Sequence, residues 1–315
     1  WVPLIDWIPL AVGTMPPWFV LALVQTLFFM GWVVFARWTQ LWRWARGPFV
    51  QAFLFALTWA GVDAARSRWP WSGFPWGSVA LPQVDSPLVH LAPYGGTTLI
   101  TAVVVFLAVL VRRAFAARDA AVVREHWFSR PALAVIVAAV HVASLAISLP
   151  NQAENGMLRV GVVQGDIALP GAEAYSREGE VTDNNVRASL ELASSPQVID
   201  RPIDIALWGE GSVDRDPLAF PAIGQAVDSA ATALDAPILI GYTNLNERDH
   251  VKNRLALWEP GTGMDEAARY SKHVPVPFGE FIPFRDVIAS FATEVAQASK
   301  DMEAGEEPPL MTVRA

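Results

Sequence analysis

Three charged side chains in the second half of the sequence could together support acyl transfer. Glu210 directly follows the apolar run IDIALW and has a glycine on each side, while Lys272 and Glu280 lie in the segment RYSKHVPVPFGEFIPF. A carboxylate at the end of a strand can act as a general base, and a lysine can stabilise a developing oxyanion. Glu280 could orient Lys272 through a charge-assisted hydrogen bond. The three residues therefore form a candidate acid–base site.

Each of these residues, considered alone, also fits an ordinary surface position. Glu210 would then be a solvated turn carboxylate, Lys272 a surface lysine and Glu280 a surface carboxylate. Asn253, at the start of an apolar run, is interpreted as a turn former. The five histidines are scattered, and neither an HExxH motif nor a phosphate-binding loop occurs. We therefore expect no metal site and no cofactor.

Composition divides the chain into two unlike halves. Residues 1–150 contain ten arginines and no lysine against five acidic residues, and twelve of the fourteen tryptophans. Residues 151–315 contain 13 basic residues against 26 acidic ones. The hydrophobic fraction of 53% is high for a soluble protein, whereas the charged fraction of 17% is high for a pure membrane bundle. These numbers predict a transmembrane domain followed by an acidic domain outside the bilayer.

Apolar stretches in the first half have the length of membrane spans, for which a helix needs about 20 apolar residues. We expect four spans, near residues 14–36, 48–65, 94–111 and 131–149. Asp63 and Arg66, at the end of the second stretch, have the i, i+3 spacing of an ion pair at a membrane edge. His141, within the fourth stretch, is interpreted as a polar helix-packing residue.

Arginine distribution predicts the orientation of these spans. The loops after the first and third stretches carry three and five arginines and are predicted to be cytoplasmic. The loop 66–93 carries only two arginines, so we expect this loop and the whole second half to lie outside the cytoplasm. Trp69, Trp71 and Trp76 in that loop are typical of an aromatic belt at the membrane surface.

The second half alternates between apolar runs and helix-like segments. The apolar runs, which are rich in β-branched residues and bounded by turn residues, are 158–164, 203–208, 237–243 and 253–259. Helices are predicted over 176–193 and 217–235, with Pro217 in the first turn of the second helix. Alternating strands and helices favour an α/β sandwich. Near-continuous apolar strands further predict a sheet that is covered on both faces.

Five segments, taken in order, resemble the bacterial apolipoprotein N-acyltransferase family, which consists of polytopic membrane enzymes with a nitrilase-like domain. VGVVQGDI resembles the opening strand of that domain, IALWGEGS its W-P-E segment, and RYSKHVPVPFGEFIPF its lysine segment. SGFPWGSVA and LAPYGG resemble the loop and span start of the membrane half. Gly209 departs from the family proline, and Val274 and Pro275 depart from the usual His and Leu.

The resemblance implies a fold and a role for each site residue. The implied fold is a polytopic α-helical membrane bundle, residues 1–150, followed by an extracytoplasmic nitrilase-like α-β-β-α sandwich, residues 151–315. Glu210 would be the general base, Lys272 the oxyanion-stabilising cation and Glu280 the supporting acid. The implied location is the bacterial inner membrane.

The resemblance also implies a reaction with a covalent intermediate. A cysteine thiolate would take a fatty acyl group from a membrane phospholipid as a thioester. It would then pass the group to the N-terminal α-amine of the diacylglyceryl-cysteine of an apolipoprotein. The partners would be these two lipid substrates and the bilayer, with no nucleic acid. In the family the cysteine follows a segment that resembles LMTVRA, and residues 1–315 contain none. We therefore expect an incomplete sandwich that is inactive by itself.

Two other functions remain open from the residues. The chain could be a non-catalytic membrane scaffold for a glycosyltransferase, in which case the strand after Ala315 would lack the cysteine. It could also be a membrane-tethered amidase or nitrilase, which would use the same residues with water as the second nucleophile. Identification of the acyl acceptor would separate the hydrolase from the acyltransferase.

Overall fold

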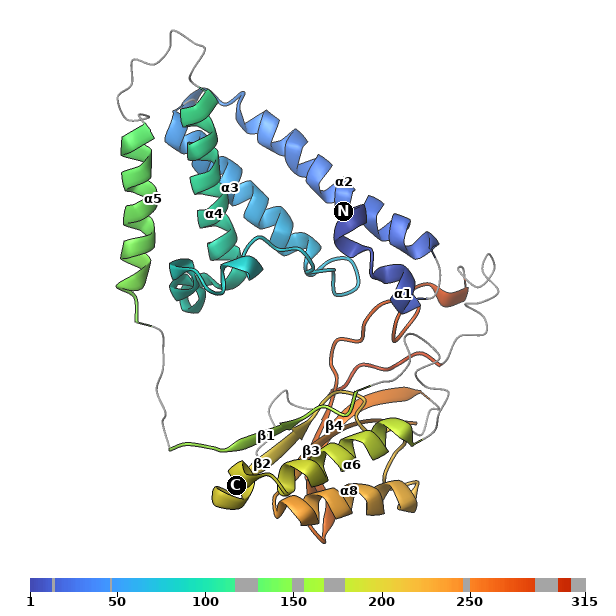
Figure 1. Cartoon of the computed structure of the whole chain (residues 1–315). Coiled ribbons are helices and arrows are strands. Elements are labelled where there is room, and N and C mark those ends of the chain that lie inside the picture. Colours follow the sequence, from blue (N-terminus) through green and yellow to red (C-terminus); the bar gives the residue numbers. More distant parts are fainter. Residues whose placement is uncertain are drawn as a thin grey trace. The chain divides into compact units, whose positions relative to one another are not determined.

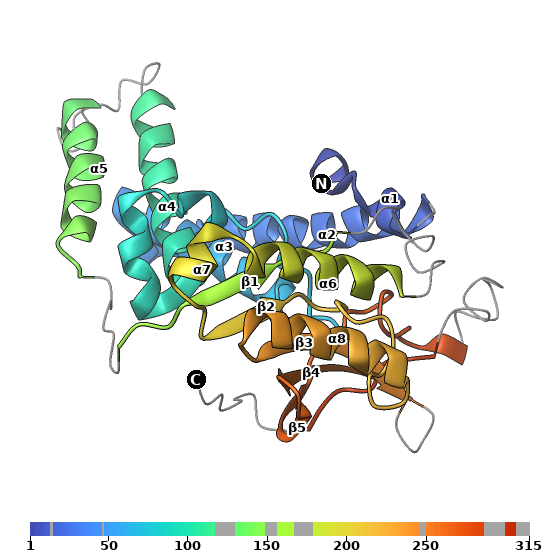
Figure 2. The same ribbon diagram turned by 60° about the horizontal axis from the view of Figure 1, so that its bottom comes forward.

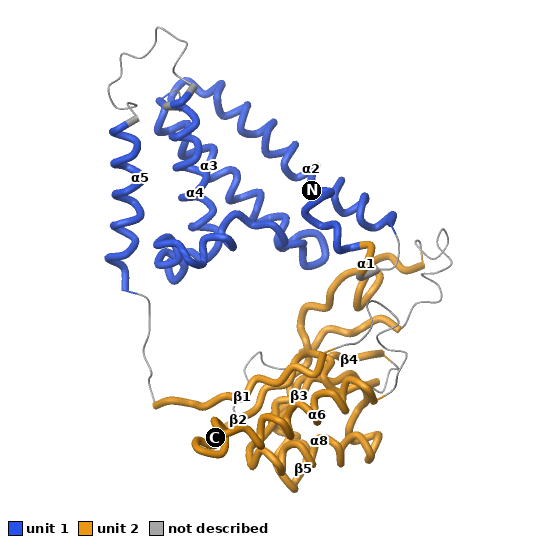
Figure 3. Tube along the Cα trace, in the orientation of Figure 1, with its two compact units in different colours: residues 1–8, 15–152 blue, residues 9–14, 153–315 orange. Residues whose placement is uncertain are grey.

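The chain folds into two compact units. The computed structural model describes residues 1–12, 15–45, 47–116, 130–148, 156–166, 179–245, 250–286 and 300–306 (Figure 1). Residues 1–8 and 15–152 form the first unit, and residues 9–14 and 153–315 form the second (Figure 3).

The first unit is helical. Three of its helices are long and apolar enough to cross a membrane: α2 (Pro16–Thr39), α3 (Pro48–Arg66) and the stretch Pro87–Arg113, most of which belongs to α4 (Ala92–Ala116) (Figure 1). They coincide with the first three predicted spans. The shorter helices of this unit include η1 (Val2–Ile5), η2 (Arg43–Ala45), η3 (Leu81–Gln83) and η4 (Pro87–Leu91). Helix α1 (Ile8–Val12) begins at the last residue of the first segment of this unit, and its other residues are assigned to the second unit.

The fourth predicted span corresponds to a shorter helix. Helix α5 (Arg130–Leu145) has 16 residues, fewer than the three membrane-length helices. Residue 149, the predicted end of this span, lies outside the described residues. The fourth span therefore stays a prediction. Helix α4 is interrupted near its start, where Gly96 adopts a positive φ of 56° that favours glycine.

The predicted ion pair at the end of α3 is confirmed. Arg66 Nη2 lies 2.5 Å from Asp63 Oδ1, and the Arg66 side chain is completely buried. Asp63 Oδ2 accepts a hydrogen bond from Ser78 Oγ at 2.9 Å. Arg66 Nη1 donates to the carbonyl oxygens of Phe74 at 2.8 Å and Trp76 at 2.9 Å. The pair thus ties the loop between α3 and α4 to the end of α3.

The second unit contains one five-stranded mixed sheet in the order β1-β2-β3-β4-β5. The first three strands are parallel to one another, whereas β4 is antiparallel to both β3 and β5. The strands are β1 (Val160–Val163), β2 (Ile205–Trp208), β3 (Ile238–Leu245), β4 (Val251–Glu259) and β5 (Gly263–Ser271). The parallel arrangement of β1, β2 and β3 brings the carboxyl ends of these strands to one edge of the sheet.

Two helices cover one face of this sheet. Helices α6 (Glu180–Ala193) and α8 (Pro221–Leu234) lie side by side there, and the short helix α7 (Pro196–Asp200) follows α6 (Figure 2). Their apolar residues, including Val227 and Leu234, pack with Trp208 and Ile240 of the strands. On the other face, Val160 and Val162 are 41% and 76% exposed. The predicted cover on both faces is therefore not observed for β1.

The four predicted strands are confirmed to within a few residues, but two details differ. Strand β5 was not predicted, because its sequence GMDEAARYS is largely polar. Helix α8 begins at Pro221 rather than at Pro217, so the prediction for Pro217 is wrong. Pro217 instead lies in a turn, in which Asp216 Oδ1 accepts a hydrogen bond from the backbone N–H of Leu218. Both Pro217 and Pro221 are suited to the first turn of a helix. The hydrogen bond of the Asp216 side chain holds Pro217 in a turn, so the helix begins at Pro221.

Candidate active site

Glu210 lies on a glycine-flanked turn at the carboxyl end of β2. The turn closes through a hydrogen bond from the Ser212 N–H to the Gly209 carbonyl oxygen at 3.2 Å. Gly211 has a positive φ of 65°, which a residue with a side chain rarely adopts. The Glu210 side chain is 59% exposed, so it lies at the surface of the unit. The prediction that Glu210 follows the end of a strand is therefore confirmed.

Lys272 directly follows β5 and is held by its backbone on both sides. Its N–H donates to the Asn253 carbonyl oxygen in β4 at 2.8 Å, and its own carbonyl oxygen accepts from the Gly305 N–H at 2.8 Å. The side chain is 27% exposed. These bonds fix the point at which the lysine leaves the sheet.

Glu280 is the most buried of the three predicted residues, with a side chain that is 14% exposed. Its backbone N–H donates to the Val276 carbonyl oxygen at 2.8 Å, and its Oε2 accepts from the Val276 N–H at 2.6 Å. The Glu280 carbonyl oxygen accepts from the Met302 N–H at 2.7 Å. The loop between Val276 and Glu280 is therefore a closed hydrogen-bonded turn, and this turn orients the carboxylate.

The three predicted residues meet in one network. Lys272 Nζ lies 2.9 Å from Glu210 Oε1 and 3.0 Å from Glu280 Oε1. The network has a fourth member, because Asn253 Nδ2 donates to the same two oxygens, with a distance of 3.1 Å to Glu280 Oε1. Glu210 thus uses one oxygen for both partners. The interpretation of Asn253 as a turn former is wrong, since it is the third residue of β4 and binds both carboxylates.

A signal for Asn253 was present in the sequence. Side chains alternate between the two faces of a strand, so Asn253, Leu255 and Leu257 share one face of β4. Leu257 is 1% exposed. The position of Asn253 in line with these two leucines indicates that it belongs to the strand and not to a turn. The sequence does not show that β4 pairs with β5, and this pairing places Asn253 beside Lys272.

The network determines the charge states of its members. Burial tends to raise the pKa of Glu210, but the hydrogen bond and charge of Lys272 and the hydrogen bond of Asn253 outweigh burial, so the pKa is lowered. Burial tends to lower the pKa of Lys272, but Glu210 and Glu280 outweigh it and the pKa is raised. At neutral pH the site therefore holds an ionised carboxylate that can accept a proton next to a full positive charge.

We expect Glu210→Gln to reveal this pair in the pH dependence of stability. The lowered pKa of Glu210 gives stability that is lost as pH falls below its ordinary value of 4.5. The raised pKa of Lys272 gives stability that is lost as pH rises above 10.5. Because Glu210 is largely exposed, the difference in unfolding free energy near pH 7 should be only about 0–1 kcal/mol. Thermal unfolding of both proteins in detergent between pH 4 and 11 measures this difference, and a difference that grows below pH 4.5 would contradict the assignment.

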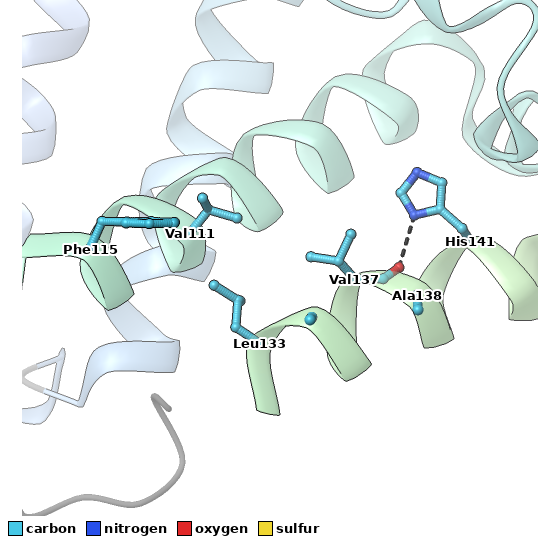
Figure 4. Close-up of a pocket in the computed structure, with 7 residues that line it drawn as sticks. Val111, Phe115, Leu133, Val137, Ala138 and His141 are labelled. Atoms are coloured by element: carbon cyan, nitrogen blue, oxygen red, sulfur yellow. Dashed lines mark hydrogen bonds between the residues drawn. The ribbon is translucent and has the colours of Figure 1, made fainter. Parts of the chain in front are cut away.

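The other chemistry-bearing residues have contacts of their own. Across the parts of the chain that the structure describes, no group of three or more His, Asp or Glu residues is placed to hold a metal ion. His273, next to Lys272, has its ring centroid 5.2 Å from that of Tyr270. His141 lines a groove of about 540 Å³ between α4 and α5, and its Nδ1 donates to the Val137 carbonyl oxygen at 2.8 Å (Figure 4). This bond lies within α5, so the helix-packing role of His141 stays a prediction.

The two units define a class of protein. Three helices have the length and composition of membrane spans, and an α/β unit in the same chain holds a Glu–Lys–Glu network at one edge of its sheet. The molecule is therefore a membrane protein with a charged Glu–Lys–Glu network on an α/β domain.

Comparisons with known proteins show which proteins the chain resembles. Residues 1–110 match the model of the apolipoprotein N-acyltransferase N-terminal domain. The chain is 31% identical to the apolipoprotein N-acyltransferase of Mycolicibacterium smegmatis, over 90% of this chain and 49% of the relative. It is 31% identical to the protein of that name from Photobacterium profundum, over 79% of this chain and 46% of the relative. The corresponding protein from Vibrio parahaemolyticus is 26% identical, over 91% of this chain and 56% of the relative.

The chain is similar to apolipoprotein N-acyltransferases over most of its own length, and the resemblance found in its sequence is confirmed. It spans about half the length of the curated relatives it matches.

Proposed function

We propose that this protein transfers a fatty acyl group from a membrane phospholipid to the N-terminal α-amine of the diacylglyceryl-cysteine of apolipoproteins. The observation that carries the proposal is the contact of Lys272 Nζ with both Glu210 and Glu280, in a chain related to proteins named apolipoprotein N-acyltransferase. The membrane-length helices support the proposal because both substrates are lipids.

The chemistry proceeds in two acyl transfers through a thioester. Glu210 removes the proton of a cysteine thiol, and the thiolate attacks the ester carbonyl carbon of the phospholipid. Lys272 stabilises the tetrahedral oxyanion, the C–O bond breaks, and the lysophospholipid leaves with the proton from Glu210. The α-amine then attacks the thioester and gives a proton to Glu210, and the thiol is released. Residues 1–315 contain no cysteine, so the thiol has to come from outside them.

We further propose a nitrilase-like α-β-β-α sandwich for the second unit, located on the outer side of the bacterial inner membrane. The mixed sheet with helices on one face supplies one α-β half of such a sandwich. The arginine-rich loops on one side of the spans and the acidic second half support this orientation. Glu280 acts in this proposal as the residue that supports the charge and position of Lys272.

The test is a two-stage acylation assay on the whole gene product in detergent micelles. In the first stage the protein is mixed with a phospholipid that carries an isotopically labelled acyl chain, and mass spectrometry of the intact protein detects one added acyl group. In the second stage a diacylglyceryl-cysteine lipopeptide is added. We expect the label to move to the lipopeptide amine, and Glu210→Gln to form little acyl-protein.

Other outcomes separate the alternative functions. Release of labelled fatty acid without transfer to the lipopeptide would indicate a hydrolase. A folded gene product that never acquires the acyl group would contradict the acyltransferase proposal and favour a membrane scaffold. The matched control is Glu191→Gln, the same change at an exposed carboxylate of α6, which should form acyl-protein as the original does.

A further inference from the structure

Helix α6 carries a row of buried polar residues on the face that packs into the second unit. Thr182, Asn185 and Ser189 are 0%, 3% and 0% exposed. Their spacing of three and four residues places them on one side of the helix. The face of a helix that packs against a core is normally apolar, so three polar residues there need partners.

Each residue of this polar row has a partner in the segment that carries Glu210. Ser189 Oγ accepts a hydrogen bond from Trp208 Nε1 at 3.0 Å, and Asn185 Nδ2 donates to the Ser212 carbonyl oxygen at 3.2 Å. Thr182 Oγ1 donates to Asp214 Oδ2 at 2.6 Å and accepts from the Asp214 N–H at 3.0 Å. The row therefore holds the chain immediately before the Glu210 turn and immediately after it.

Strand β3 holds the same turn from another side. The Ser212 hydroxyl is buried and accepts a hydrogen bond from the Gly241 N–H at 3.0 Å. The Gly241 carbonyl oxygen accepts from the Val213 N–H at 2.9 Å. A Cβ atom on Gly241 would lie 2.6 Å from the Gly209 carbonyl oxygen and 3.0 Å from Glu210 Cα. The backbone of β3 is thus in direct contact with the turn.

This turn needs such support, because its own sequence allows many conformations. Glycine populates more of φ/ψ space than any other residue, and Gly209 and Gly211 flank Glu210. The Glu210 side chain is 59% exposed, so packing against neighbours does little to orient it. Its 2.9 Å contact with Lys272 consequently depends on where the backbone of the turn is held.

We infer that the polar row of α6, together with Ser212, positions Glu210 against Lys272. These are positioning residues, because they act on the reacting groups only through the Glu210 backbone. This inference rests on the proposed function, because it is the acid–base chemistry that requires a defined geometry of Glu210 and Lys272. Its test uses the contact between Glu210 and Lys272 and does not depend on acyl transfer.

The test is competitive labelling of lysines in the whole chain, folded in detergent. The sequence contains only three lysines, Lys252, Lys272 and Lys300, so peptide mass spectrometry resolves each of them. Trace acetic anhydride at pH 8 reacts with the neutral amine, and a lysine that is held as an ammonium by a carboxylate reacts slowly. A tenfold change in the neutral fraction corresponds to about one pH unit in the pKa. The measured quantity is the labelling of Lys272 relative to Lys252 in β4, which corrects for general loosening of the sheet.

Four variants define the result. Glu210→Gln removes the negative charge beside Lys272 and should raise the Lys272 to Lys252 ratio about 3- to 10-fold. Ser212→Ala and Thr182→Val, which keep the approximate shape of each side chain, should raise the ratio in the same direction by at least about twofold. Ser229→Ala, at an exposed serine of α8, should leave the ratio unchanged.

The outcomes separate the inference from the function. If Glu210→Gln raises the ratio while folded Ser212→Ala and Thr182→Val do not, the positioning role is overturned and the proposed function stands. If Glu210→Gln itself has no effect, the Glu210–Lys272 contact is absent and both proposals fail. Should Ser212→Ala not fold, the nearly isosteric Thr182→Val decides.

Discussion

Replacement of Lys272 by methionine is expected to slow acyl-thioester formation about 10²- to 10³-fold, the usual cost of removing one oxyanion-stabilising group. Methionine retains much of the aliphatic length of lysine but has no charge. The oxyanion would then lose its cation, and Glu210 and Glu280 would face each other without the ammonium that contacts both of them. Like charges at such a distance raise the pKa of one carboxyl group, which reduces the fraction of ionised base.

Single-turnover measurement of acyl-protein in the whole gene product gives this rate. Lys272→Arg should restore little activity, because the planar guanidinium cannot place one nitrogen at about 3 Å from two separate oxygens as the compact ammonium does. Lys252→Met, a change of the same type in β4, is the control and should retain the original rate. A Lys272→Met rate within about threefold of the original would exclude the oxyanion role.

Replacement of Arg66 by leucine is expected to lower the unfolding free energy of the first unit by about 3–5 kcal/mol, because it leaves a buried carboxylate without its partner. Arg66 is 0% exposed and also donates to Gln25 Oε1 at 3.3 Å, in addition to its bonds with Asp63 and the loop carbonyls. Its guanidinium carbon lies 5.0 Å from the centroid of the Trp1 ring. One substitution therefore removes contacts with α2, α3, the loop and Trp1.

Denaturant unfolding in detergent, followed by tryptophan fluorescence, measures the loss. Arg68→Leu is the matched control, since Arg68 is exposed and donates only to the Ala64 carbonyl oxygen among the hydrogen bonds described. The double variant Asp63→Leu/Arg66→Leu should recover part of the stability, because it removes both charges together. Equal stability of Arg66→Leu and Arg68→Leu would show that the buried pair has no structural role.

Short polar breaks after apolar runs, together with the family resemblance, pointed to Glu210, Lys272 and Glu280, and the structure brings the three side chains together. Each lies where a strand ends or where a turn begins, and such positions are visible in sequence. Asn253 was misread because its role depends on strand register, which brings β4 beside β5. Hydrogen bonds across a sheet join residues that are distant in sequence, and no local pattern reports them.

Strand β5 was also missed because a tertiary contact, and no local sequence pattern, defines it. Its residues Asp265, Glu266 and Arg269 resemble a loop, and the strand is defined by the pairing of Gly263, Met264 and 269–271 with β4. The polar row of α6 was also missed, because polar residues at helical spacing usually indicate a solvated face. Tertiary contacts determined both features, whereas the membrane-length helices, whose signal is their own length and composition, were predicted directly.

The interruption of α4 at Gly95 and Gly96 limits the thickness of bilayer that the first unit can match. The uninterrupted helix from Thr97 to Ala116 is about 30 Å long at about 1.5 Å per residue, and α3, with 19 residues, is about 28 Å long. Helix α2, with 24 residues, is about 36 Å long and exceeds both. In a membrane thin enough to suit α3 and α4, α2 has to tilt or the lipids around it have to stretch. Such hydrophobic mismatch would make the stability of this protein depend on the acyl-chain length of the lipids around it.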